Sequence, residues 1–328
     1  MKRLLTTAVA SVVAALSPIA AYAQPKPVNV LVTIGMIGDV VENVGGDCVE
    51  VTAMMGPGVD PHLYEPSSRD VRSLRSADVI FFSGYSLEGQ LGDVLARFGE
   101  QKPTIAVAPS SIDTGDLITV QDVYGIDPHL WMDASLWSRI APTIAGTLAD
   151  AQPECADDFK TNAQNYVEQL TALHDWVKKA IASIPEGQRS LVTAHDAFAY
   201  FGRAYGIEVL GIQGISTESE ASVADIRATA KQVAAKGVPA IFVESTINPR
   251  TIQSVIDAAR EQGHQVEIGG ELYSDAMGET GTAGGTYIGM IFENTRNITT
   301  ALGGQLPEIP DVLSGWAEQW NIAGTGEN

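Results

Sequence analysis

Cysteine, histidine and positive charge are all scarce in this sequence. Its 328 residues hold 2 cysteines and 5 histidines, and 20 lysines and arginines stand against 40 aspartates and glutamates, which gives a formal net charge of −20. Cys48 and Cys155 are too few for a disulfide scaffold and too far apart for a local zinc clip, although an oxidising compartment would permit a bridge between them. The acidic balance disfavours nucleic acid and anionic lipid as partners, because both would be repelled.

Long apolar runs are also absent, except at the N-terminus. Lys2 and Arg3 precede an apolar run over residues 4–20, and residues 21–23 (A-Y-A) form a small-residue cleavage signal. This pattern predicts a secretory signal peptide, residues 1–23, rather than a membrane anchor, because the run is short and small residues stand where cleavage needs them. No cysteine follows it to carry a lipid. We therefore expect an exported, soluble, periplasmic protein.

Beyond this segment, β-branched apolar runs alternate with segments of helical periodicity. We expect strands near residues 28–34, 49–55, 79–83, 104–107, 190–194, 207–211, 240–244 and 265–268. Helices are expected near residues 37–44, 68–76, 87–98, 196–205, 222–236, 249–262, 286–301 and 310–321. The alternation predicts an α/β fold in which helices flank mostly parallel sheets.

One stretch near the middle of the chain has a different pattern. Between Pro153 and Pro185, apolar residues recur at spacings of three and four; they are Phe159, Ala163, Tyr166, Leu170, Leu173, Val177 and Ile181. We expect one long helix over residues 153–186 that connects two lobes. The N-terminal α/β lobe would comprise residues 24–152, and the C-terminal α/β lobe residues 187–328.

The candidate functional residues are three histidines and one aspartate, each placed after a predicted strand. His62 and His129 lie in D-P-H-L sequences, His195 directly follows L-V-T-A, and Asp275 ends G-G-E-L-Y-S-D. In open α/β sheets, ligands bind outside the carboxyl ends of the strands. Imidazole and carboxylate together suit a divalent transition metal. Because two of the four come from each half of the chain, we expect a metal held between the lobes.

Each of these residues also has a simpler interpretation. Asp-Pro is common in turns, so one D-P-H alone would be weak evidence for a ligand. The two D-P-H-L repeats together with a histidine at a strand end favour metal ligation. We interpret His174 as a solvated residue of the long helix and His264 as part of a hydrophilic turn. Trp131 and Trp137 are interpreted as core residues.

The chain resembles the metal-specific solute-binding proteins of ABC importers for zinc and manganese. The resemblance covers nearly all of the mature chain and is carried by P-H-L-Y-E-P (61–66), A-D-V-I-F-F-S-G (77–84), D-P-H-L-W-M-D (127–133), T-A-H-D-A-F-A-Y-F (193–201) and L-Y-S-D-A-M-G (272–278). It implies two α/β lobes bridged by a rigid long helix, with the metal in the cleft and an ABC permease as the partner. The ligands it implies are the four residues chosen above on chemistry.

Two departures from that family bear on which metal is bound. Zinc-dedicated members often have a long loop rich in histidine, whereas residues 108–126 are short and hold none. Manganese-dedicated members commonly have a glutamate where this chain has His195. Three imidazoles and one carboxylate suit zinc somewhat better than manganese. Affinity should fall toward pH 6, because histidine must lose a proton to bind. Residues near the motifs that could orient the rings are Glu65, Asp133, Asp196 and Glu244.

Three classes of function fit an exported protein of this kind. The first is capture of a divalent metal, zinc or manganese, and its delivery to an ABC permease by a monomeric protein that is not an enzyme. The second is a secreted zinc metallohydrolase, which would need an open coordination position and a nearby base. Four available ligands and the lack of an H-E-x-x-H motif argue against it. The third is a binder of sugars, amino acids or siderophores, whose cleft would be lined by more varied groups.

Overall fold

The computed structural model describes residues 26–121 and 125–322, so the predicted signal peptide lies outside the described residues. The N-terminal half is built on one parallel sheet in the order β2-β1-β3-β4, formed by β1 (Val28–Val32), β2 (Val49–Ala53), β3 (Val79–Phe82) and β4 (Thr104–Ala106). Its helices are α1 (Gly35–Gly45), α2 (Ser68–Ser76), α3 (Leu91–Gly99), α4 (Val107–Ser111), α5 (Ala134–Trp137) and α6 (Ile140–Ala151). The central strands are apolar and buried, which is typical of a parallel sheet covered on both faces.

The C-terminal half contains two parallel pairs of strands. They are β5 (Ser190–His195) with β6 (Glu208–Gln213), and β7 (Ala240–Glu244) with β8 (Glu267–Leu272). Strands β5 and β7 lie next to each other, so the two pairs form one layer. The helices of this half are α8 (Ala199–Tyr205), α9 (Val223–Lys236), α10 (Arg250–Glu261), α11 (Tyr287–Ala301) and α12 (Ser314–Gln319).

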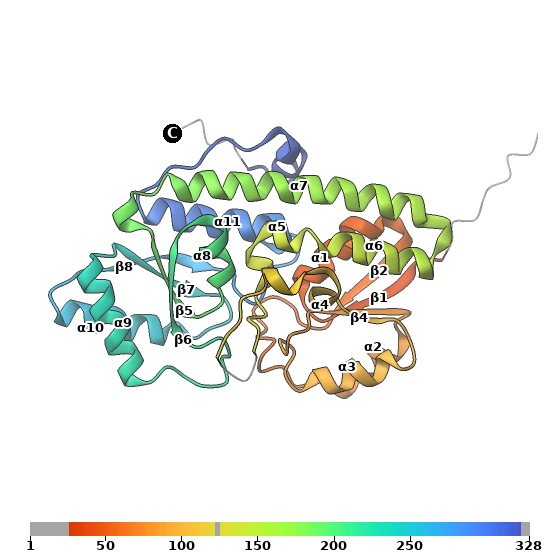
Figure 1. The fold of residues 1–328 in the computed structure, drawn as a ribbon, viewed down its shortest axis with the longest axis horizontal. Coiled ribbons are helices and arrows are strands. Elements are labelled where there is room, and N and C mark those ends of the chain that lie inside the picture. Colours follow the sequence, from red (N-terminus) through yellow and green to blue (C-terminus); the bar gives the residue numbers. More distant parts are fainter. Residues whose placement is uncertain (1–25, 122–124, 323–328) are drawn as a thin grey trace, which may run out of the picture.

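The long helix α7 (Ala156–Ala182) runs along both halves of the molecule (Figure 1). Its 27 residues span about 40 Å at 1.5 Å per residue. It packs against α1 and α6 of the first half and against α8 and α11 of the second. The apolar stripe found in the sequence is buried along its whole length. The predicted architecture of two α/β lobes bridged by a long helix is therefore confirmed, although residues 153–155 form a 3₁₀ turn before the helix begins.

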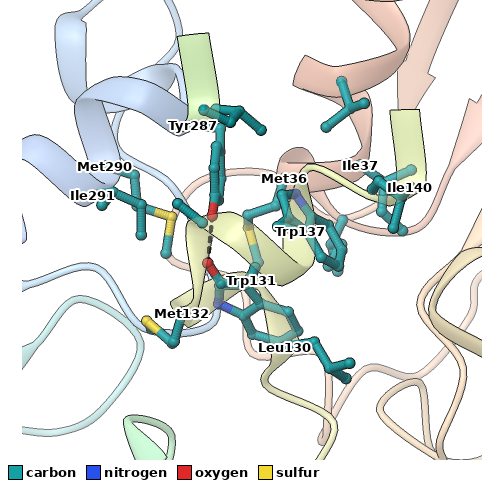
Figure 2. Packing of buried hydrophobic residues seen from close by; sticks show 14 of the residues in the cluster. Met36, Ile37, Leu130, Trp131, Met132, Trp137, Ile140, Tyr287, Met290 and Ile291 are labelled. Atoms are coloured by element: carbon teal, nitrogen blue, oxygen red, sulfur yellow. Dashed lines mark hydrogen bonds between the residues drawn. The ribbon is translucent and has the colours of Figure 1, made fainter. Parts of the chain in front are cut away.

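A continuous hydrophobic core crosses from one lobe to the other. Met36 from α1 and Trp131 and Trp137 from the segment after His129 pack with Tyr287 and Ile291 of α11 (Figure 2). The Tyr287 hydroxyl donates a hydrogen bond to the main-chain oxygen of Trp131, at 2.6 Å. An inter-lobe contact this apolar resists separation, because opening the lobes would expose it to water.

A buried carboxylate lies where the two lobes and the long helix meet. Asp39 of α1 accepts hydrogen bonds from the hydroxyl of Tyr166 on α7 and from the backbone N–H of Tyr287, the first residue of α11. Burial raises the pKa of Asp39 to about 6, although both hydrogen bonds act in the opposite direction. This single side chain thus connects three helices, and it adds to the evidence that the lobes are held in one arrangement.

A disulfide joins the two cysteines. Cys48, just before β2, is bonded to Cys155, just before α7, with 6.6 Å between their Cα atoms. The sequence left this pairing open because nothing local brings residues 107 positions apart together. The bridge ties one end of the long helix to the first lobe. Among the described residues, no helix is both long enough and apolar enough to cross a membrane.

We expect removal of this disulfide to lower the free energy of unfolding by about 2–4 kcal/mol, because the bridge closes a long loop in the unfolded chain. Denaturant unfolding of the Cys48→Ser/Cys155→Ser double variant would measure it. Reduced wild-type protein is the matched control, and the two should unfold alike. An unchanged midpoint in both would contradict the expectation.

Candidate metal centre

The two D-P-H sequences fold into the same local structure. In each, the aspartate Oδ1 accepts a hydrogen bond from the backbone N–H of the histidine two residues later, at 2.9 Å for both Asp60 with His62 and Asp127 with His129. This is an Asx turn, in which an aspartate side chain closes the chain on itself, and proline fixes φ at the residue between. The other oxygen of Asp60 accepts from the hydroxyl of Thr217 in the second lobe, at 2.5 Å. The repeat therefore fixes the backbone ahead of each imidazole.

The imidazole of His129 is oriented by the aspartate of its own motif. Asp127 Oδ1 lies 2.8 Å from His129 Nδ1, and both side chains are fully buried. A hydrogen bond at Nδ1 leaves Nε2 without a proton in the neutral ring and therefore available to a metal. The sequence did not identify Asp127 as this partner, because a D-P-H pattern shows the turn but not the contact of the side chain with the ring.

His195 is held by an acidic residue of the neighbouring strand. It is the last residue of β5, and Glu244 is the last residue of β7. One oxygen of Glu244 accepts from the backbone N–H of His195 at 2.9 Å, and the other lies 2.5 Å from His195 Nδ1. Of the residues expected to orient a ring, Glu244 does so.

Asp275 enters the same centre from the loop after β8. The loop is fixed by Trp131, whose indole N–H donates to the main-chain oxygen of Ser274 at 2.8 Å. Trp131 also packs against the imidazole of His129, with ring centroids 5.3 Å apart. One residue of the first lobe therefore positions a histidine of its own lobe and an aspartate of the other.

The four predicted residues converge on one small volume. Potential ligand atoms of His62, His129, His195 and Asp275 all lie within 4.8 Å of one another, and all four side chains are buried. The Nε2 atoms of His62 and His129 are 3.3 Å apart. Asp275 Oδ1 is 3.4 Å from His129 Nε2, and Oδ2 is 3.1 Å from His195 Nε2 and 3.8 Å from His62 Nε2.

These separations match those between the ligands of one metal ion. A tetrahedral ion with ligands at 2.0–2.1 Å places them about 3.3–3.4 Å from each other. Among the described residues, the Nε2 of His195 and both carboxylate oxygens of Asp275 meet no partner in hydrogen-bonding geometry. Buried polar atoms without such partners are costly, and a cation among them would satisfy them all.

Without a metal, the charges of the centre are unequally distributed. Burial lowers the pKa of His62 to about 4, so this ring is neutral. Burial also acts to lower the pKa of His129, but Asp127 and Asp275 outweigh it and raise the value to about 9. Glu244 and Asp275 outweigh burial in the same way and raise the pKa of His195 well above its usual range. Against burial, His195 and His129 hold the pKa of Asp275 well below its usual range.

The remaining residues singled out from the sequence lie outside this centre. Glu65 is exposed, and Asp133 caps α5 through the backbone N–H groups of Ser135 and Leu136. Asp196 donates its backbone N–H to Gly214, and His264 contacts the main-chain oxygen of Val238 through Nε2 at 2.8 Å.

The interpretation of His174 as solvated is wrong. Its side chain is only 18% exposed, with Nδ1 3.4 Å from Asp133 Oδ1. Its ring also packs on Tyr205, with centroids 5.1 Å apart. The sequence shows only that His174 neighbours Asp175 on the predicted helix. It does not show that a residue of the second lobe, Tyr205, covers the ring.

We expect Glu244→Gln to weaken metal binding by about 10–100-fold, because loss of the carboxylate removes the charge that orients and polarises His195. Glu65→Gln is the matched control, since this glutamate is exposed close to His62 in sequence and should leave affinity unchanged. Metal titration of both variants by competition with a chelator measures the effect. Equal affinities for the two would show that Glu244 has no role at the centre.

Two α/β lobes joined by one long helix, with a buried cluster of three histidines and one aspartate between them, define a class of protein. It is the metal-binding substrate-binding protein of an uptake system. The family described as the periplasmic component A of zinc-uptake complexes matches residues 30–301. The chain belongs to this family.

Individual relatives resemble the chain over most of its length. The manganese-binding lipoprotein MntA of Bacillus subtilis (strain 168) is 47% identical over 277 residues, which cover 84% of this chain and 90% of the relative. The zinc-binding protein TroA of Treponema pallidum is 42% identical over 282 residues, covering 86% of this chain and 91% of the relative. A solved structure of periplasmic TroA superposes with a TM-score of 0.82, covering 84% of this chain and 99% of that one.

Proposed function

We propose that this protein captures one divalent transition metal ion, zinc or manganese, in the periplasm and delivers it to the permease of an ABC importer. The ligands are His62, His129, His195 and Asp275. The observation that carries this proposal is the convergence of their ligand atoms, which are all buried and lie within 4.8 Å of one another, with four pairs at 3.1–3.8 Å. Relatives named for zinc and for manganese binding support the choice of metals.

The carboxylate of Asp275 gives this centre a way to bind either metal. Its two oxygens face different histidines, Oδ1 toward His129 and Oδ2 toward His195. Bound through one oxygen, it completes a tetrahedral shell of three nitrogens and one oxygen, which suits zinc. Bound through both, it adds the oxygen that manganese prefers. The donor set favours zinc, and the carboxylate allows manganese.

The protein is a carrier and not a metallohydrolase. Catalytic zinc usually keeps three protein ligands and an open position for water, whereas here four residues surround the centre. Two acidic residues at the centre, Asp127 and Glu244, are already bonded to His129 and His195, and both oxygens of Asp60 likewise accept hydrogen bonds. These three carboxylates are therefore engaged in positioning the centre rather than held ready as a base.

Metal titration of the signal-cleaved protein tests the proposal. After chelator treatment, zinc and manganese are added separately and followed by calorimetry and by melting temperature. We expect one tightly bound equivalent and a stabilisation of about 4 kcal/mol at a thousand times Kd. Absence of tight binding by any divalent ion would refute the proposal. Sedimentation across a concentration series should show a monomer throughout.

A further inference from the structure

The candidate ligands are so well buried that an ion needs a defined route to reach them. His62 is 4% exposed, Asp275 is 1% exposed, and His129 and His195 are fully covered. The continuous core and the Asp39 junction resist separation of the lobes. A route that does not require the lobes to part would therefore have to run through a hollow already present in the fold.

One such hollow begins at Asp275. A cavity of about 140 Å³ is lined by Asp275, by Met277 and Gly278 after it, and by Gly35, Asp39 and Glu42 of α1. Asp275 is the one candidate ligand among the residues that line this cavity, and its carboxylate oxygens are themselves covered. Asp39, Glu42, Thr280 and Gly285 also line an adjoining groove of about 570 Å³ beside α7 and α12. Because the cavity and the groove share these four residues, together they lead from the protein surface to Asp275.

Glycines allow the walls of this cavity to approach one another closely. Gly35 faces Met277, and a Cβ on Gly35 would lie 3.0 Å from the methyl carbon of that methionine. On the other side, the glycine-rich segment 278–285 closes on itself, because a Cβ on Gly285 would lie 2.2 Å from the main-chain oxygen of Glu279. The flexible thioether of Met277 is the movable part of this wall.

The charge along the cavity suits a cation. Asp39 and Glu42 are three residues apart on α1, so both lie on the same face of the helix. Asp39 is engaged by Tyr166 and Tyr287, whereas Glu42 is exposed at the opening. No lysine or arginine is among the residues that line the cavity or the groove. A metal ion entering here would meet carboxylate oxygens from the surface to Asp275.

We propose that this cavity is the passage through which the metal ion enters and leaves, with Glu42 attracting the ion at its mouth and Met277 acting as a movable plug. The proposal rests on the proposed function and adds a route to it. Neither Glu42 nor Gly35 is among the proposed ligands of the bound ion. Substitutions at these positions therefore change the activation barrier for entry and release but leave the equilibrium affinity for the metal unchanged. Association and release should therefore change by the same factor.

The test measures both rates and the equilibrium constant for zinc. Stopped-flow mixing gives association, and an excess of chelator gives release. We expect Glu42→Lys to slow each about tenfold by repelling the ion at the mouth, with Kd unchanged. Glu261→Lys, an exposed site at the end of α10 with the same change in net charge, should alter neither rate. Gly35→Ala, which presses on Met277, should also slow both.

Two results would refute the proposal that the metal ion passes through this cavity. Unchanged rates in both Glu42→Lys and Gly35→Ala would place the route elsewhere, for example at the edge of the cluster near His62. Faster release at unchanged association would mean that the substitution alters the metal centre itself. Failure of wild-type protein to bind zinc or manganese would instead refute the proposed function, so the two proposals fail by different observations.

Discussion

Replacing His129 by alanine should weaken metal binding by at least about a hundredfold while the protein remains folded. Structural zinc sites with four ligands have apparent binding free energies of about 10–16 kcal/mol, so one ligand accounts for about 3 kcal/mol, or roughly a hundredfold in Kd. His129 occupies a central place in the cluster, since its Nε2 lies 3.3 Å from His62 Nε2 and 3.4 Å from Asp275 Oδ1. Water can take the coordination position that the lost imidazole leaves, but it is a weaker ligand for the metal.

The matched control is His264→Ala. His264 belongs to the second lobe, and its ring contacts the main-chain oxygen of Val238. Both variants lose one imidazole, and only the change at position 129 should alter the titration. Circular dichroism of each variant establishes that it is folded. Wild-type affinity in folded His129→Ala protein would remove this residue from the ligand set.

The location of the centre could be predicted because its residues follow strands. His195 is the last residue of β5, and Asp275 lies three residues after β8. The carboxyl ends of parallel strands lie at the same edge of a sheet. Side chains that follow those ends therefore lie close together in the crevice where ligands bind. The long helix was equally predictable, because its apolar stripe persists through seven buried positions.

Other features could not be predicted because tertiary contacts decide them. Helix α6 begins at Ile140 with Pro142 in its first turn and Gly146 inside it, so its periodicity is interrupted by residues that usually mark turns. The role of Asp127 depends on a rotamer that bends its carboxylate toward His129. The cavity at Asp275 depends on the approach of α1 to segment 278–285, two stretches more than two hundred residues apart.

In the absence of a metal, we expect protons on the histidine rings to balance the charge of Asp275. His129 and His195 flank Asp275 on its two oxygens, at 3.4 and 3.1 Å, and both rings have a raised pKa. Protonated rings around an ionised carboxylate keep the cluster compact without a cation. We therefore expect an incoming ion to exchange with protons at residues that already lie close together, rather than to assemble the site.

Metal affinity should therefore rise steeply with pH through neutrality. The pKa of His129 is raised to about 9 and that of His195 well above 6.5, while the pKa of His62 is lowered to about 4. An ion binding at pH 7 must displace protons from His129 and His195 but not from His62. Two displaced protons raise the affinity about a hundredfold for each pH unit, up to the pKa of His129 near 9. The sequence alone placed this window near pH 6, since it used the ordinary histidine value.

The stability of the metal-free protein should change in the opposite sense. A histidine whose folded pKa is raised contributes stability that is fully present below its unfolded pKa of 6.5 and is lost as pH rises through the folded value, about 9 for His129.

Calorimetric zinc titrations at pH 7 in buffers of different ionisation enthalpy count the released protons, and we expect about two per ion. Glu244→Gln should lower this count, because the carboxylate that raises the pKa of His195 is gone. Fewer than one proton released, with affinity flat from pH 6.5 to 8, would show that the rings are already neutral before the ion arrives.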